Sequence, residues 1–67
     1  MTVRYVGYHP LPGVDRDEYR DWLRIRESDD IQAELDIRAG NVPAGMILRW
    51  RGVLWSVWSD GMIRRCI

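Results

Sequence analysis

Short runs rich in apolar residues lie at the start of the chain and again in its last third. Thr2 to Tyr8 is rich in Val and Tyr, residue types that favour a strand. The last third holds three strand-like runs separated by two X-Gly pairs: Met46 to Trp50, Arg51-Gly52, Val53 to Trp58, Asp60-Gly61 and Met62 to Ile67. Because X-Gly pairs form tight hairpin turns, these runs are predicted to form an antiparallel meander.

The middle of the chain carries helix signals. Asp15 can cap a helix, with Glu18 three residues on as in a capping box, and this helix is expected to run to about Glu27. Ser28-Asp29-Asp30 is a second start signal, before a thin apolar stripe of Ile31, Leu35 and Ala39. The pattern allows either two separate helices or one kinked helix. The predicted order is β-α-α-β-β-β, a single α+β domain over residues 1–67 with helices packed on one face of an antiparallel sheet.

Two-residue turns at both X-Gly pairs would fix the strand register. Leu48 then lies opposite Trp55, and Trp55 opposite Cys66, on a nearly apolar face expected to meet the helices. The other face mixes two arginines, one tryptophan and aliphatic residues: Ile47, Arg49, Leu54, Ser56, Trp58, Ile63, Arg65 and Ile67. This face is either half covered by its own arginine side chains or a binding patch, and a register shift of one residue would exchange the two faces.

Composition excludes several classes of protein. The chain has 67 residues, ten arginines, ten acidic residues, one cysteine and one histidine, with a net charge of zero. One cysteine forms no intrachain disulfide, and no Cys/His cluster is present for a structural zinc. No apolar run is long enough to span a membrane and no signal peptide precedes the first strand, so a cytoplasmic protein without cofactors is expected.

Acidic residues are concentrated in the helical half, where residues 15 to 36 hold nine acids against four arginines. One interpretation is a solvated helix face with ion pairs between neighbouring turns. The other is that the acids imitate nucleic-acid phosphate and dock on a basic partner. The acids nominated for this role are Asp15, Asp17, Glu18, Asp21, Asp29 and Asp30.

The inventory of reactive residues indicates that the protein is not an enzyme. His9 lies in a Pro-rich loop, Cys66 lies in the last strand, and no phosphate-binding loop or convergent carboxylate pair is present. Arginines interleaved with Trp50 and Trp58 in the last third favour an alternative, a small DNA-binding accessory or regulatory protein with an Arg/Trp sheet face. The zero net charge argues against that alternative.

The end of the chain, Gly52-Val53-Leu54-Trp55 through Asp60-Gly61 to Cys66, resembles the closing hairpin of small phage anti-CRISPR proteins that inhibit type I surveillance complexes. The resemblance covers about the last quarter of the chain, with a similar length and α+β layout, and carries over no functional residue. It implies a non-enzymatic inhibitor in the host bacterial cell that binds a CRISPR surveillance complex and keeps target DNA from its channel.

The sequence therefore predicts a small binding protein of phage or mobile-element type that blocks a protein complex handling nucleic acid. Two surfaces are nominated: the six helical acids, and the sheet face with Arg49, Trp58 and Arg65. A homodimer joined by the sheet face is a third possibility.

Overall fold

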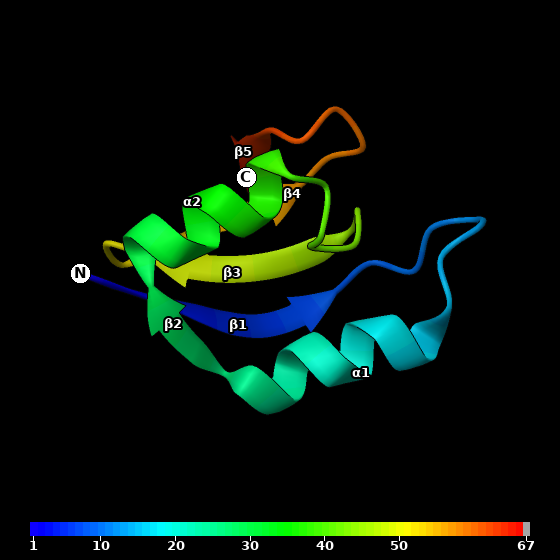
Figure 1. Ribbon diagram of the computed structural model, residues 1–67, viewed down its shortest axis with the longest axis horizontal. Coiled ribbons are helices and arrows are strands. Elements are labelled where there is room, and N and C mark those ends of the chain that lie inside the picture. Colours follow the sequence, from blue (N-terminus) through cyan, green and yellow to red (C-terminus); the bar gives the residue numbers. More distant parts are fainter. Residues whose placement is uncertain (67) are drawn as a thin grey trace.

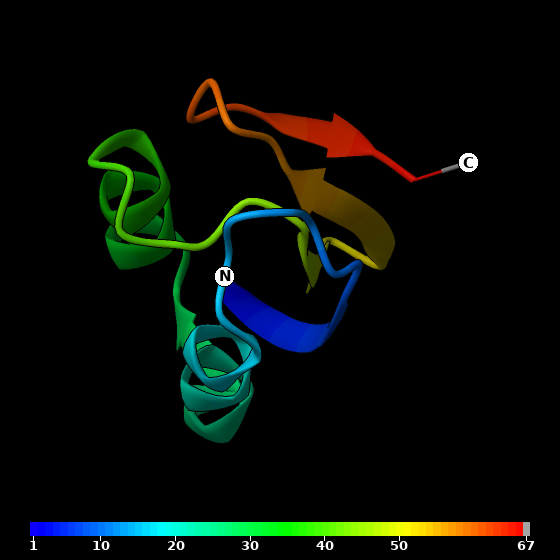
Figure 2. The same ribbon diagram turned by 90° about the vertical axis from the view of Figure 1, so that its right-hand side faces the viewer.

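The first strand of the chain joins the C-terminal meander in one sheet by pairing with the first strand of the meander. The computed structural model describes residues 1–66, and their elements in chain order are β1 (Thr2–Tyr8), α1 (Arg16–Ile25), β2 (Glu27–Asp29), α2 (Asp30–Arg38), β3 (Met46–Trp50), β4 (Val53–Val57) and β5 (Ile63–Arg65) (Figure 1). The strands form one five-stranded sheet in the order β2-β1-β3-β4-β5, and every pairing is antiparallel. Both helices lie on the same side of the sheet (Figure 2). The predicted α+β architecture is confirmed.

The short strand β2 separates the two helices and was not predicted. Arg26 ends α1 with a φ of 59°, a left-handed conformation that reverses the chain direction. Its carbonyl then accepts a hydrogen bond from the Tyr5 amide at 2.7 Å, and Glu27 to Asp29 pair with the start of β1. The helices are therefore separate, and the alternative of one kinked helix is wrong.

The first helix begins where the sequence predicted but with a different cap geometry. The Asp15 carboxylate accepts a hydrogen bond from the Asp17 amide at 3.0 Å, while the Glu18 amide donates to the Asp15 carbonyl at 3.1 Å. The helix ends at Ile25, two residues before the expected Glu27. The side chain that it buries completely is Tyr19.

The second helix is rotated away from the expected orientation. Its buried residues are Ala33 and Ile37, whereas Ile31 and Leu35 are 65% and 58% exposed. The predicted inward stripe of Ile31, Leu35 and Ala39 is therefore wrong. The cause is β2, because pairing of Asp29 with Thr2 anchors the first residue before α2 at the sheet edge and sets the rotation of the helix.

The predicted register holds for one hairpin and fails for the other. Leu48 lies opposite Trp55, and both Arg51 and Gly52 have positive φ, as a two-residue turn requires. Across β4 and β5, however, Trp55 lies opposite Arg65 rather than Cys66. This shift by one residue exchanges the two faces of β5.

A longer second loop causes the shift. Val57 pairs with Ile63, so the loop runs from Trp58 to Met62 instead of through Asp60 and Gly61 alone. The Trp58 amide donates to the Met62 carbonyl at 2.8 Å, and the Asp60 carboxylate accepts from the Met62 amide at 3.0 Å. Ile63 thus packs against the core, contrary to the prediction, and Ile67 lies outside the described residues.

The core fills the space between the helices and the inner sheet face. Its buried members are Val3, Tyr5, Tyr19, Ala33, Ile37, Val42, Met46, Leu48 and Val57. The Tyr5 hydroxyl has no hydrogen-bond partner within residues 1–66, and its ring packs 5.3 Å from that of Trp22. Burial raises the pKa of Tyr5, and the negative charge of Asp36 adds a smaller increase. The nearby Ser28 hydroxyl offsets part of the increase in pKa.

Candidate binding surface

The sheet face away from the helices is covered by no other element among the described residues. We call it the open sheet face. Cross-strand register places two rows of side chains on it, one through Arg4, Arg49 and Leu54 and one through Ile47, Ser56 and Arg64, with Trp58 beside the second row. Arginine and tryptophan, which this face carries beside its aliphatic residues, are enriched among the residues that contribute most to binding energy in protein interfaces.

Arg4 and Arg49 are directly opposite each other on β1 and β3. Both side chains are exposed, and neither forms an ion pair within residues 1–66. Like charges directly opposite each other on a sheet destabilise the pair. The arrangement therefore offers two free guanidinium groups side by side, which can bind a carboxylate or phosphate group.

Trp58 is held in a defined orientation by its neighbours. Its indole Nε1 donates to Ser56 Oγ at 3.0 Å, and the guanidinium of Arg64 lies 4.3 Å from the ring centroid in a cation–π contact. Arg64 also pairs with Asp60 at 3.1 Å. The ring remains 48% exposed, so Trp58 can bury one of its faces against a partner.

The structure corrects the predicted sheet site at Arg65. Arg49 and Trp58 are on the open sheet face as expected, but Arg65 lies opposite Trp55 and so belongs to the inner side of β5. Arg64 takes the predicted place of Arg65 because the second loop is longer than two residues. Arg4 was missed, although the alternation of Arg4 with two apolar neighbours in β1 already indicated that its side chain lies on the polar face.

The acids of α1 are used within the helix itself. Asp15 is the cap, Asp17 pairs with Arg20 at 3.6 Å, and Asp21 pairs with Arg24 at 3.7 Å. Glu18 is exposed in the first turn. Since α1 contains three acids and three arginines, it presents no strongly acidic surface.

The remaining two nominated acids lie at the start of α2, beyond the opposite end of α1 (Figure 1). Asp29 caps α2 by accepting from the Ile31 amide at 3.2 Å, and Asp30 lies 3.7 Å from the amino group of Met1. The Asp29 side chain and, after it, the positive amino group of Met1 lower the pKa of Asp30. The six nominated acids are thus split between α1 with its cap and the start of α2, and they do not form one patch.

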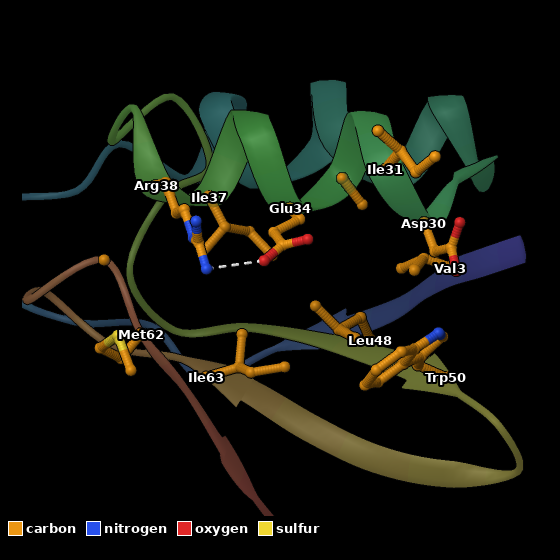
Figure 3. A pocket seen from close by; sticks show the side chains of 12 residues that line it. Val3, Asp30, Ile31, Glu34, Ile37, Arg38, Leu48, Trp50, Met62 and Ile63 are labelled. Carbon is orange, nitrogen blue, oxygen red and sulfur yellow. Dashed lines mark ion pairs between the residues drawn. The ribbon is translucent and has the colours of Figure 1, made fainter.

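A groove of about 240 Å³ lies between α2 and the inner sheet face (Figure 3). Its walls are mostly apolar, with the ion pair of Glu34 and Arg38 at 2.8 Å on the helix side. The indole Nε1 of Trp50, a residue that lines the groove, is buried without a hydrogen-bond partner within residues 1–66. The sequence did not reveal this groove because it depends on the rotation of α2.

Reactive residues do not converge anywhere in the described part of the chain. His9 is exposed in the loop after β1, and Cys66 is a free, half-buried thiol. Within residues 1–66 no group of three or more His, Cys, Asp or Glu side chains is placed to hold a metal ion. No helix among these residues is long and apolar enough to cross a membrane.

Comparisons with known proteins add no relative. No family model matches the chain, and searches of curated proteins and of solved structures find no significant match.

Proposed function

We propose that this chain is a small binding protein without catalytic activity that docks on a protein complex handling nucleic acid and blocks it, as an inhibitor of phage or mobile-element type. The open sheet face is its contact surface. The observation that carries the proposal is the pair of free arginines, Arg4 and Arg49, opposite each other on an uncovered face. The resemblance of the closing segment to anti-CRISPR proteins supports the inhibitor class and suggests a CRISPR surveillance complex as the partner.

The arginine pair has a physical cost that a partner would remove. Two like charges in directly opposite cross-strand positions lower stability by roughly 0.2–1 kcal/mol. A carboxylate placed between them turns this repulsion into two charge-assisted hydrogen-bonding contacts. Leu54 in the same row and the exposed ring of Trp58 supply apolar area beside the charges. The partner is therefore expected to present acidic side chains next to an apolar patch.

A protein partner fits this face better than nucleic acid does. Glu27 lies opposite Arg4 on β2, and Asp60 pairs with Arg64, so acidic groups border the patch at both ends. Among the exposed large apolar side chains of residues 1–66, Trp58 is the single aromatic ring, and Arg64 covers one of its faces. Binders of single-stranded nucleic acid use several stacking rings along a positive groove.

Direct DNA binding is the second candidate, because the same two arginines could hold phosphate groups. Neutralising two phosphates gives a shallow salt dependence, with a slope of roughly −2 in a plot of log affinity against log salt. The proposal does not rest on phosphate mimicry by α1, since Asp17 and Asp21 already pair with arginines on the same helix.

The test is affinity capture with charge-reversal variants of the full chain. The wild type, the double variant Arg4→Glu/Arg49→Glu and the control Asp17→Arg/Asp21→Arg are immobilised and exposed to a nuclease-treated bacterial lysate. We expect the wild type and the control to retain the same stoichiometric protein complex, and the arginine variant to lose it.

Two results would contradict the proposal. Loss of the complex only in the Asp17/Asp21 variant would transfer binding to α1 and restore phosphate mimicry. Recovery of DNA without protein, when nuclease is omitted, would make the second candidate correct. Circular dichroism of each variant shows that the sheet is intact, so that lost binding is not a folding defect.

A further inference from the structure

The second helix is apolar on its outer side as well as on its inner side. Ile31 and Leu35, one helical turn apart, are 65% and 58% exposed on the side away from the buried Ala33 and Ile37. We call this pair the α2 ridge. A helix with apolar residues on two opposite sides is expected to be covered on both. Within the described chain, only the inner side is covered.

The α2 ridge borders the groove described above. Ile31 belongs to the ridge and also lines the groove, whose other wall includes Met62, 59% exposed (Figure 3). A convex apolar ridge therefore lies next to a concave apolar groove on one surface. Such a surface is self-complementary under a two-fold axis, because each ridge can occupy the groove of the other copy.

We infer that a second copy of this chain docks here, with the two α2 helices antiparallel and each α2 ridge over the groove of the other copy. The charges of α2 favour this direction. Asp30 and Glu34 lie in its first half and Arg38 in its last turn, so antiparallel helices bring the Arg38 end of each copy to the Asp30 end of the other. The third acid, Asp36, accepts a hydrogen bond from Gln32 at 3.1 Å and lies on the side of α2 opposite Glu34 and Arg38. The opposed helix dipoles add to the attraction.

The dimer leaves the open sheet face accessible, because α2 lies on the other side of the sheet (Figure 2). Two open sheet faces would then point outward from one dimer and could engage two sites of a partner. The association is weak, since the α2 ridge and the exposed part of the groove wall rest on three large apolar residues of the described chain, Ile31, Leu35 and Met62. We expect a dissociation constant on the order of tens of micromolar. The inference rests on α2 alone and is independent of the proposed function.

Sedimentation equilibrium of the purified full chain from about 2 µM to 1 mM tests the inference. The weight-average mass should rise with concentration from 7.9 kDa toward twice that value. The variant Leu35→Glu should weaken association at least about 100-fold, because each copy loses one leucine from the interface and gains a buried charge. The matched control Leu54→Glu places the same charge at an exposed leucine of the open sheet face and should leave the association unchanged.

A wild-type mass of one chain at all concentrations would overturn the inference. So would association that persists in Leu35→Glu but disappears in Leu54→Glu, since the copies would then meet through the open sheet face. Both substituted side chains are exposed, and thermal unfolding followed by circular dichroism shows whether each variant retains the fold.

Discussion

The hydroxyl group of Tyr19 ties two loops to the first helix, and its removal gives the sharpest stability prediction. The side chain is fully buried, donates to the Ala44 carbonyl at 2.6 Å and accepts from the Leu11 amide at 3.2 Å. Tyr19→Phe keeps the ring and its stacking on Tyr8, with centroids 4.5 Å apart, and deletes these two hydrogen bonds together with the longer one, 3.4 Å, to the His9 carbonyl.

The size of the effect follows from where the freed groups lie. A buried polar group that loses its partner costs roughly 1–3 kcal/mol. Leu11 is partly exposed, so water can replace one of the two bonds, and the lower half of that range applies. In a domain of this size about 1–2 kcal/mol corresponds to a fall in Tm of roughly 5–15 °C.

Thermal and urea unfolding followed by circular dichroism measure this change, with Tyr8→Phe as the matched control. The Tyr8 hydroxyl makes no hydrogen bond to a side chain or backbone group within residues 1–66, so its loss should alter Tm by less than about 3 °C. Equal Tm values for the two variants would refute the argument that the Tyr19 hydroxyl holds the loops together.

Two further predictions concern the ends of β2 and β4. The pKa of Asp30 is lowered in the folded state, so its carboxylate adds stability above the unfolded pKa of about 3.9, and this stability is lost as the pH falls through the folded pKa. Asp30→Asn should therefore be less stable than the wild type near pH 7 and equally stable at the acid end, as measured by urea unfolding between pH 2 and 7. Gly52→Ala should lower the free energy of unfolding by about 1 kcal/mol, because the φ of Gly52 is 76°; the added methyl group meets no other atom, so this backbone strain is the whole effect. Arg51→Gly should raise the free energy of unfolding, because Arg51 has a φ of 54°. Equal free energies of unfolding for the two variants would contradict this reasoning.

Local sequence signals were sufficient for most of the fold. The run of Val and Tyr in Thr2 to Tyr8 and the Arg51-Gly52 turn are short-range features, and both were predicted with the correct bounds or register. Features that depend on contacts between distant segments were missed. Glu27 to Asp29 has no apolar alternation, and it is a strand only because β1 offers it an edge.

Errors in the candidate site have the same origin. Asp60-Gly61 has the composition of a two-residue turn, but hydrogen bonds of Trp58 and Asp60 to Met62 enclose a longer loop. The resulting shift of one residue moved Arg65 off the open sheet face and placed Arg64 on it. Alternation along a strand shows which residues share a face of the sheet. It does not show which of the two groups of residues faces the helices when the length of the preceding loop is unknown.

The surfaces left uncovered follow from how few buried residues this chain has. Its core holds nine buried apolar side chains among residues 1–66, enough for one helical layer on one side of the sheet. Both helices use that side, so the second sheet face and the outer side of α2 stay exposed, although each carries apolar residues. The two surfaces differ in charge, because the open sheet face has two unpaired arginines while α2 carries both signs. A heterologous acidic partner as proposed therefore suits the sheet face, and a second copy suits α2, whose Arg38 end meets the Asp30 end of the other copy when the helices are antiparallel.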